Sequence, residues 1–317
     1  MLRMFCRSIL LPATLALLLA STGAQATDKL TLLLDWFINP DHAPLFVAEE
    51  LGYFAAHGLD VEIIAPADPN DPPKLVAAGK ADIALSYQPQ LYVQVAAGLP
   101  LTRFGTLIAT PLNTLLVLQD GPVKSIADLK GRKVGYSIGG FEDALLRAML
   151  ARHGLSLNDI TLVNVNFSLS PALLSGQVDA VIGAYRNFEL NQMDIEGHKG
   201  RAFYVEEEGV PSYDELILVA NPERMDRAVL RRFLDALEDG VRYLVNHPDE
   251  SWALFIRGRG ELDDELNRRA WRDTLTRFAL RPAALDHARY ARFAQFMYEQ
   301  GLIPEALSVA DYAIILE

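Results

Sequence analysis

Aromatic and polar side chains follow several buried apolar stretches of this chain, where they could bind a small ring compound. Trp36 and Asn39 come just after the apolar run 30–34. An exposed Trp offers a face for stacking, and Asn offers both a donor and an acceptor. The candidate ligand-binding residues are Trp36, Asn39, His42, Ser86, Tyr87, Gln88, Ser137, Gly139, Gly140, Tyr185 and Glu189. These residue types predict recognition by stacking and hydrogen bonding.

Tyr87 and Tyr185 take equivalent places after two similar strands, which predicts that they face one cleft from opposite sides. Open α/β sheets bind ligands beyond the carboxyl ends of their strands. Structural roles are the alternative: Trp36 could be a core residue, His42 an ordinary residue at the start of a helix, and Glu189 a solvated helix residue.

A glycine-containing segment at 137–141 lies between a predicted strand and a predicted helix. Glycines allow backbone N–H groups to approach a ligand, and a helix N-terminus favours an acceptor or anion there. The alternative is an ordinary turn. The segment lacks the Gly-Lys-Ser/Thr ending of a phosphate-binding Walker loop.

The chain contains one pattern twice, at residues 58–83 and 154–181. Each copy follows His-Gly-Leu and ends in Gly-x-x-Asp before a buried strand, with glycines 21 residues apart in the first copy and 22 in the second. Two similar α/β lobes would leave a cleft between them, where small ligands usually bind. The alternative is that any α/β protein repeats such units.

The apolar pattern predicts strands alternating with helices, and therefore parallel, doubly wound sheets. Predicted strands are 30–34, 61–64, 83–85, 133–137 and 160–165, and predicted helices are 43–56, 74–78, 142–152, 251–257, 262–278 and 284–300. The runs 115–118 and 216–220 are predicted to cross between lobes as a hinge. The first lobe then comprises 27–114 and 218–317, and the second 115–217.

Three segments carry a family resemblance: LDWFINPDHAPLFVAEELGYFAAHGLDVEI at 34–63, PPKLVAAGKADIALSYQPQ at 72–90 and SGQVDAVIGAYRNFE at 175–189. They resemble the periplasmic binding proteins of ABC importers, in the branch related to yeast pyrimidine synthases and bacterial thiamin-precursor binders. The resemblance implies a two-lobed type II fold that closes on a small solute. It also implies an ABC permease with its ATPase as partner, and a monomer.

In that family the motif matching GAYRNFE places an aromatic ring and a carboxylate against an aminopyrimidine. The resemblance therefore implies that Tyr185 and Glu189 bind a thiamin-related ring of the hydroxymethyl or formylamino type. The family often has Trp where this chain has Arg186. An arginine there could bind a carboxylate, sulfonate or phosphate, so a different small organic anion is the alternative ligand.

Residues 1–26 have the features of a cleaved secretory signal: a basic start with Arg3 and Arg7, a short apolar run, and Ala24-Gln25-Ala26. Its removal leaves 27 basic against 41 acidic residues, a net charge of −14. Such a surface repels nucleic acid and anionic lipid. We therefore expect a periplasmic protein that does not insert into the membrane after cleavage.

An enzyme related to the pyrimidine synthases is the competing class. As the resemblance has it, those enzymes carry a cysteine-rich iron-binding motif, whereas the one cysteine of this chain, Cys6, lies in the predicted signal. The six histidines show no metal-ligand spacing, and no Gly-x-Ser-x-Gly or His-Glu-x-x-His motif occurs. We therefore expect a binding protein without cofactor or metal.

Overall fold

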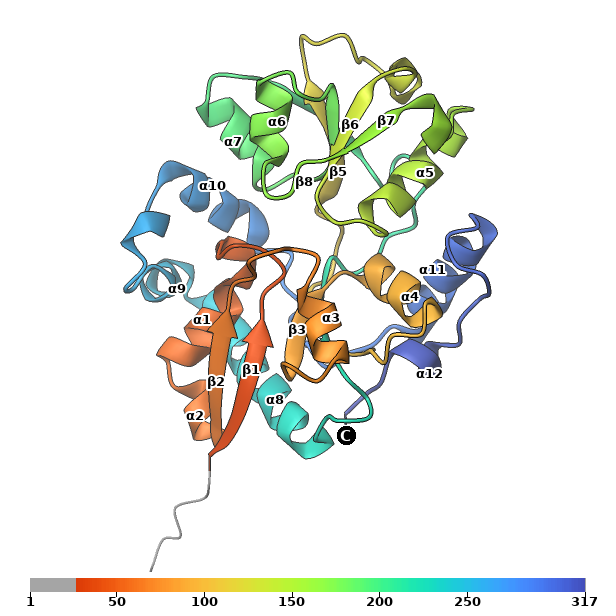
Figure 1. Ribbon diagram of the computed structural model, residues 1–317. Coiled ribbons are helices and arrows are strands. Elements are labelled where there is room, and N and C mark those ends of the chain that lie inside the picture. The colour runs from red at the N-terminus through yellow and green to blue at the C-terminus, as the bar shows by residue number, and fades with distance from the viewer. Residues whose placement is uncertain (1–26, 317) are drawn as a thin grey trace, which may run out of the picture.

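The structure is a computed structural model that describes residues 27–316, and it consists of two α/β lobes (Figure 1). The first lobe contains a sheet of order β2-β1-β3-β10-β4, formed by β1 (Asp28–Leu33), β2 (Leu59–Ile64), β3 (Ile83–Ser86), β4 (Thr102–Ile108) and β10 (Leu216–Ala220). The second contains a sheet of order β7-β6-β8-β5-β9, formed by β5 (Asn113–Leu118), β6 (Lys133–Tyr136), β7 (Thr161–Asn164), β8 (Ala180–Tyr185) and β9 (Gly200–Tyr204).

The two sheets have the same arrangement of strands. In each, three strands pair in parallel: β2, β1 and β3 in the first lobe, and β7, β6 and β8 in the second. The next strand, β10 or β5, is antiparallel to both neighbours and is the one by which the chain enters from the other lobe. The two-lobed α/β prediction is confirmed. The predicted parallel pairing is present in three strands of each sheet, and β10 and β5 add antiparallel pairs.

Helices flank both sheets (Figure 1). The helices before β10 are α1 (Ala43–Glu50), α2 (Tyr53–Ala56), α3 (Pro72–Ala77), α4 (Gln88–Ala96), α5 (Glu142–Arg152), α6 (Leu169–Leu174) and α7 (Glu189–Ile195). The single helix predicted at 43–56 is divided into α1 and α2, because Gly52 adopts a left-handed conformation with φ of 72°. Glycine takes this conformation without the steric cost of a Cβ.

The C-terminal segment after β10 is mainly helical, as the apolar periodicity predicts. It contains α8 (Arg227–Asn246), α9 (Pro248–Phe255), α10 (Glu265–Thr274), α11 (His287–Glu299) and α12 (Val309–Tyr312). The apolar side chains of α8 are largely buried, and α8 packs on α1 and α2. The helix predicted at 262–278 is shorter, because Asp264 caps its start by accepting a hydrogen bond from the N–H of Asn267.

Two short connections join the lobes, at residues 109–112 and 205–215. Glu215 joins one connection to the other, since its Oε2 accepts from the N–H groups of Leu112 (2.6 Å) and Asn113 (3.0 Å). The runs 115–118 and 216–220, predicted as the hinge, lie inside the sheets instead. Strands with hydrogen bonds on both sides resist changes in φ and ψ, so bending is more readily absorbed in the connections.

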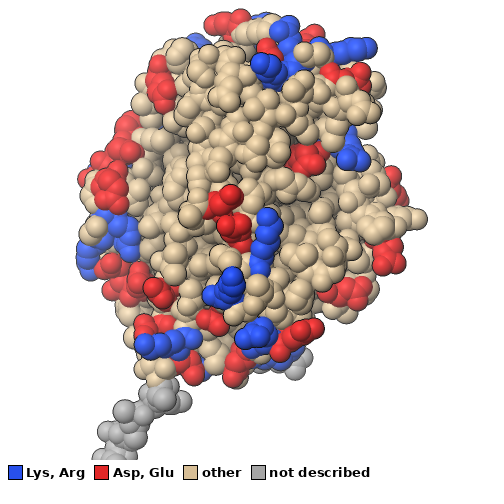
Figure 2. Space-filling model, viewed as in Figure 1, with Lys and Arg blue, Asp and Glu red and all other residues tan. Residues whose placement is uncertain are grey.

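The predicted signal peptide lies outside the described residues. Between residues 27 and 316, no helix combines the length and the apolar character that a membrane crossing needs. On the face seen in Figure 2, basic and acidic side chains lie close together, both around the rim and near the centre, with uncharged surface between them. On this face the charged residues therefore form no extended patch of one sign.

Candidate functional site

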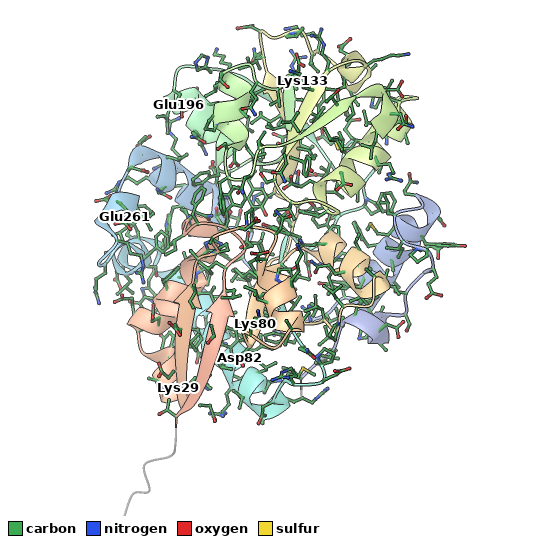
Figure 3. All side chains as sticks on the ribbon, viewed as in Figure 1. Lys29, Lys80, Asp82, Lys133, Glu196 and Glu261 are labelled. Atoms are coloured by element: carbon green, nitrogen blue, oxygen red, sulfur yellow. The ribbon has the colours of Figure 1, made fainter. Side chains whose placement is uncertain are left out.

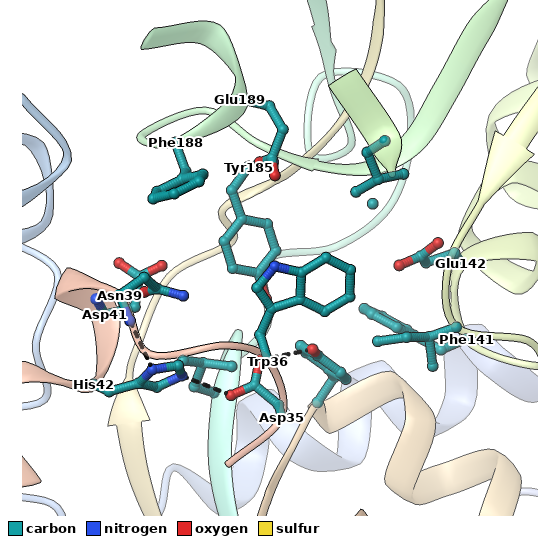
Figure 4. Close-up of a pocket in the computed structure, with 15 residues that line it drawn as sticks. Asp35, Trp36, Asn39, Asp41, His42, Phe141, Glu142, Tyr185, Phe188 and Glu189 are labelled. Atoms are coloured by element: carbon teal, nitrogen blue, oxygen red, sulfur yellow. Dashed lines mark hydrogen bonds and ion pairs between the residues drawn. The ribbon is translucent and has the colours of Figure 1, made fainter. Parts of the chain in front are cut away.

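A cavity lies between the two lobes, beyond the carboxyl ends of β1, β3, β6 and β8 (Figure 4). It encloses about 470 Å³ of empty space, part of it open to solvent. The lining residues are Asp35, Trp36, Asn39, Asp41, His42, Tyr87, Ile138, Phe141, Glu142, Leu169, Gly183, Tyr185, Phe188, Glu189 and Leu216. Six of the candidate residues are among them: Trp36, Asn39, His42, Tyr87, Tyr185 and Glu189.

Asp35 is held at the floor of the cavity by two first-lobe side chains. Its Oδ1 lies 3.0 Å from Nε2 of His42, and its Oδ2 accepts from the hydroxyl of Tyr87 at 2.7 Å. Nδ1 of His42 accepts from the N–H of Asn39 at 3.3 Å, so Nε2 carries the proton that Asp35 accepts. Both ring nitrogens of His42 are thus occupied by the protein. His42 orients Asp35 and keeps no ring nitrogen for a ligand.

Aromatic side chains from both lobes meet at the cavity. Trp36 lies 4.5 Å from Phe167 between ring centroids, and Tyr87 stacks on Phe141 at 4.6 Å with an interplanar angle of 11°. In both pairs the first ring belongs to the first lobe and the second ring to the second lobe. Trp36 is half-buried and projects into the centre of the cavity, near Tyr185 (Figure 4). Aromatic rings of the two lobes are therefore in contact beside the cavity.

Glu189 is the first residue of α7 and is almost fully buried. Its Oε2 accepts from the backbone N–H of Tyr185 at 2.6 Å. Burial raises the pKa of this carboxyl to about 7, although that hydrogen bond lowers it. The hydroxyl of Tyr185 is directed to Oε1 of Glu215 at 3.4 Å. Tyr185 can therefore present its ring to a ligand while Glu189 presents a carboxyl oxygen.

Asp41 connects the lobes at the edge of the cavity. Its Oδ1 accepts from Nδ2 of Asn187, in the second lobe, at 2.7 Å and from the hydroxyl of Thr274, on α10, at 2.9 Å. Burial raises the pKa of Asp41 to about 6, with these hydrogen bonds lowering it. Sequence reasoning missed this residue, although it lies in the same loop as Trp36 and Asn39. An acidic residue beside a helix start is too common to indicate a site.

Glu142, like Asp35 and Asp41, is a carboxyl of the cavity that sequence reasoning missed, and it directly follows the glycine-containing segment 137–141. It is the first residue of α5, and its Oε2 accepts from the N–H of Ser137 at 2.7 Å. Gly140 N–H donates to Asp143, and Gly139 N–H donates to Oδ1 of Asn70 in the first lobe. In this structure protein oxygens occupy these amides, and their binding of a ligand acceptor stays a prediction.

Two further candidates, Ser86 and Gln88, lie outside the cavity lining. The Ser86 hydroxyl donates to Gln90, and Gln88 donates to the Tyr92 hydroxyl and accepts from the N–H of Asp214. These side chains attach α4 to its surroundings. Their partners are all protein groups, so the structure assigns them a packing role.

Arg186 does not line the cavity. Its guanidinium forms two hydrogen bonds with Glu206, at 2.6 and 2.8 Å, and lies 4.4 Å from the ring centroid of Tyr204. It also donates to the carbonyl oxygens of Leu112 and Asn113 in the neighbouring connection. Arg186 therefore supports the junction between the lobes.

The cavity is acidic and aromatic. Four carboxyl groups line it, those of Asp35, Asp41, Glu142 and Glu189, and neither Lys nor Arg is among the lining residues that the structure describes. Within residues 27–316, no group of three or more His, Cys, Asp or Glu is arranged to hold a metal ion. Such a wall favours a flat ligand that donates hydrogen bonds or carries positive charge.

Comparison with protein families identifies the chain. Residues 39–251 match the family described as NMT1/THI5 like. The chain belongs to the NMT1/THI5-like family. It is 54% identical over 301 residues to a Haemophilus influenzae protein named as a thiamine biosynthesis protein, covering 95% of this chain and 96% of that protein. It is 34% identical to the formylaminopyrimidine-binding protein of Halalkalibacterium halodurans, covering 80% and 77% of the two chains.

The NMT1/THI5-like relatives also include an enzyme, the 4-amino-5-hydroxymethyl-2-methylpyrimidine phosphate synthase of Schizosaccharomyces pombe. It is 26% identical, covering 77% of this chain and 73% of the enzyme. Among solved structures, the alkanesulfonate-binding protein SsuA from Xanthomonas axonopodis pv. citri has a TM-score of 0.72 at 18% identity, covering 92% of this chain and all of that one. This likeness confirms the two-lobed binding-protein fold predicted from the sequence.

Proposed function

We propose that this protein is the periplasmic solute-binding component of an ABC importer and captures a thiamin-related aminopyrimidine between its lobes. The observation that carries the proposal is the composition of the cavity: aromatic rings from both lobes, buried carboxyls and neither Lys nor Arg in the described lining. The names of the relatives support the same ligand class, because one of them is a formylaminopyrimidine-binding protein.

The ring is proposed to lie between Trp36 and Tyr185, with its amino group directed to Glu189. A 4-aminopyrimidine places a ring nitrogen beside its amino group. The pKa of Glu189 is near 7, so the carboxyl can bind in either protonation state. When neutral it donates to the ring nitrogen, and when ionised it accepts from the protonated ring nitrogen. In both states it accepts from the amino group. Two parallel hydrogen bonds of this kind need a partner that both donates and accepts.

A sulfonate or other organic anion, the alternative ligand class, suits this cavity poorly. Its negative charge would lie among four carboxyls, and Arg186 is engaged with Glu206 elsewhere. An unpaired buried charge costs several kcal/mol. We also infer a binding role rather than catalysis, because His42, the histidine of the cavity, has both ring nitrogens bonded to the protein.

Calorimetry tests the ligand class directly. Hydroxymethylpyrimidine and its formylamino analogue should bind, whereas an alkanesulfonate should not. Binding of the sulfonate without binding of either pyrimidine would refute the proposal. Mass spectrometry of ligand retained by the purified protein would identify the solute independently.

Delivery to a permease is proposed to follow from lobe closure about the connections at 109–112 and 205–215. Small-angle scattering should show a smaller radius of gyration with the ligand than without it. An unchanged radius with a tightly bound pyrimidine would exclude closure while leaving the ligand assignment intact.

A further inference from the structure

Glu142 is a buried carboxyl in the cavity that the proposed contacts do not use. It is 3% exposed and comes from the second lobe, as Glu189 does, but from a different helix. In Figure 4 its carboxyl lies beside Phe141, well separated from Glu189. The cavity therefore has two carboxyls at separate points of its wall.

The backbone of β8 is shaped to admit this carboxyl. Gly183, in the middle of the strand, has φ of 99°, a conformation that L side chains rarely adopt. A Cβ at this position would overlap the carboxyl of Glu142. The pairing of β5 with β8 shifts register between Thr114 and Leu115, and the N–H of Gly183 donates to Oδ1 of Asn113 at 3.1 Å. The Glu142 carboxyl thus occupies the space that a side chain at position 183 would fill.

Hydrogen bonds from the backbone hold Glu142, yet no cation among the described residues compensates it. Ser137 N–H donates to its Oε2, and the titratable groups that face it are Asp143, Glu215 and Tyr87. All three are acidic. Burial raises the pKa of Glu142 to about 8, so the carboxyl is mainly neutral at pH 7 in the empty cavity. A buried carboxyl of this kind is costly without a partner.

We propose that Glu142 binds a second donor group of the ligand, carried on a ring substituent, and that a primary amine is preferred there over a hydroxyl. This inference rests on the proposed function and specifies its ligand: an aminopyrimidine with an aminomethyl-type substituent. The amine enters as an ammonium ion, the carboxyl of Glu142 releases its proton to solvent, and the resulting ion pair is buried. The several carboxyls of the wall add to the attraction for a positive charge.

Three probes test the proposal by calorimetry: 4-amino-2-methylpyrimidines with aminomethyl, hydroxymethyl or methyl at position 5. On the unmodified protein the aminomethyl compound should bind most tightly and the methyl compound about 10- to 100-fold more weakly, as expected for loss of a charge-assisted hydrogen bond. At pH 7 the aminomethyl compound should release protons, seen as a dependence of the heat on the ionisation enthalpy of the buffer. The methyl compound should release none through Glu142.

Glu142→Gln should reduce the difference in affinity between the three probes to less than about 3-fold. Glu196→Gln, at the exposed residue that follows α7, should preserve the difference. Equal binding of all three probes to the unmodified protein would overturn the inference and leave the proposed function standing. Binding of none would overturn both. The series on the unmodified protein decides the question even where Glu142→Gln fails to fold.

Discussion

Replacement of Glu189 by glutamine separates a ligand-binding carboxyl from an ordinary helix residue. Glutamine has the same shape, and its carbonyl oxygen can still accept from the N–H of Tyr185, as Oε2 of Glu189 does at 2.6 Å. Its NH₂ can donate to a neutral ring nitrogen, but glutamine cannot supply the carboxylate that accepts from a protonated ring. Loss of a charge-assisted hydrogen bond costs about 1.5–3 kcal/mol. We therefore expect calorimetry to show an affinity about 10- to 100-fold lower.

The same replacement should change stability in a pH-dependent way. The pKa of Glu189 is raised from 4.5 to about 7 in the folded protein, so the folded state holds a proton that the unfolded state loses. Its contribution to stability is fully present below pH 4.5 and is lost as the pH rises through 7. Relative to the unmodified protein, Glu189→Gln should gain about 1 kcal/mol at pH 5 and about 3 kcal/mol at pH 8.

Urea unfolding at pH 5 and pH 8, without ligand, measures this difference. Glu196→Gln is the matched control, because Glu196 is the exposed residue that directly follows the same helix (Figure 3). The control should change stability by less than about 0.5 kcal/mol at either pH. If the free energy of unfolding of Glu189→Gln changed with pH as that of the unmodified protein does, the raised pKa of Glu189 would be refuted. Unchanged pyrimidine affinity would remove Glu189 from the binding site.

Three further results are expected. Trp36→Ala should weaken pyrimidine binding about 5- to 150-fold by calorimetry, since stacking on an aromatic ring contributes about 1–3 kcal/mol; an equal affinity would show that the indole only supports the lobes. Asn187→Ala removes the hydrogen bond to Asp41 between lobes, so the liganded protein should have a larger radius of gyration by scattering, and an unchanged radius would contradict that role. Arg186→Gln should leave pyrimidine affinity within about 3-fold, because its guanidinium is bound to Glu206; a loss above about 10-fold would place it in the site.

Much of the architecture could be predicted from local patterns. The duplicated segment and its apolar strands indicated two similar lobes, because burial of a parallel strand requires a continuous apolar run that is visible in the sequence. The loop after β1 and the motif before α7 placed Trp36, Asn39, Tyr185 and Glu189 at the carboxyl ends of strands, and the cavity brings these four residues together. The position of each residue relative to its strand is enough for that prediction, since the carboxyl ends of parallel strands lie at the same edge of a sheet.

Only the tertiary structure decided how the carboxyls act. Asp35 and Glu142 are both acidic residues near a strand end, a pattern that is as common on surfaces as in sites. Their burial depends on contacts with Tyr87 and Gly183, which are 52 and 41 residues away in the chain. Arg186 does not line the cavity, although its neighbour Tyr185 does, because its guanidinium is bound to Glu206. The direction of a side chain and the charge around it are set by residues distant in sequence, so the acidity of the cavity could not be predicted from the motif that contributes to it.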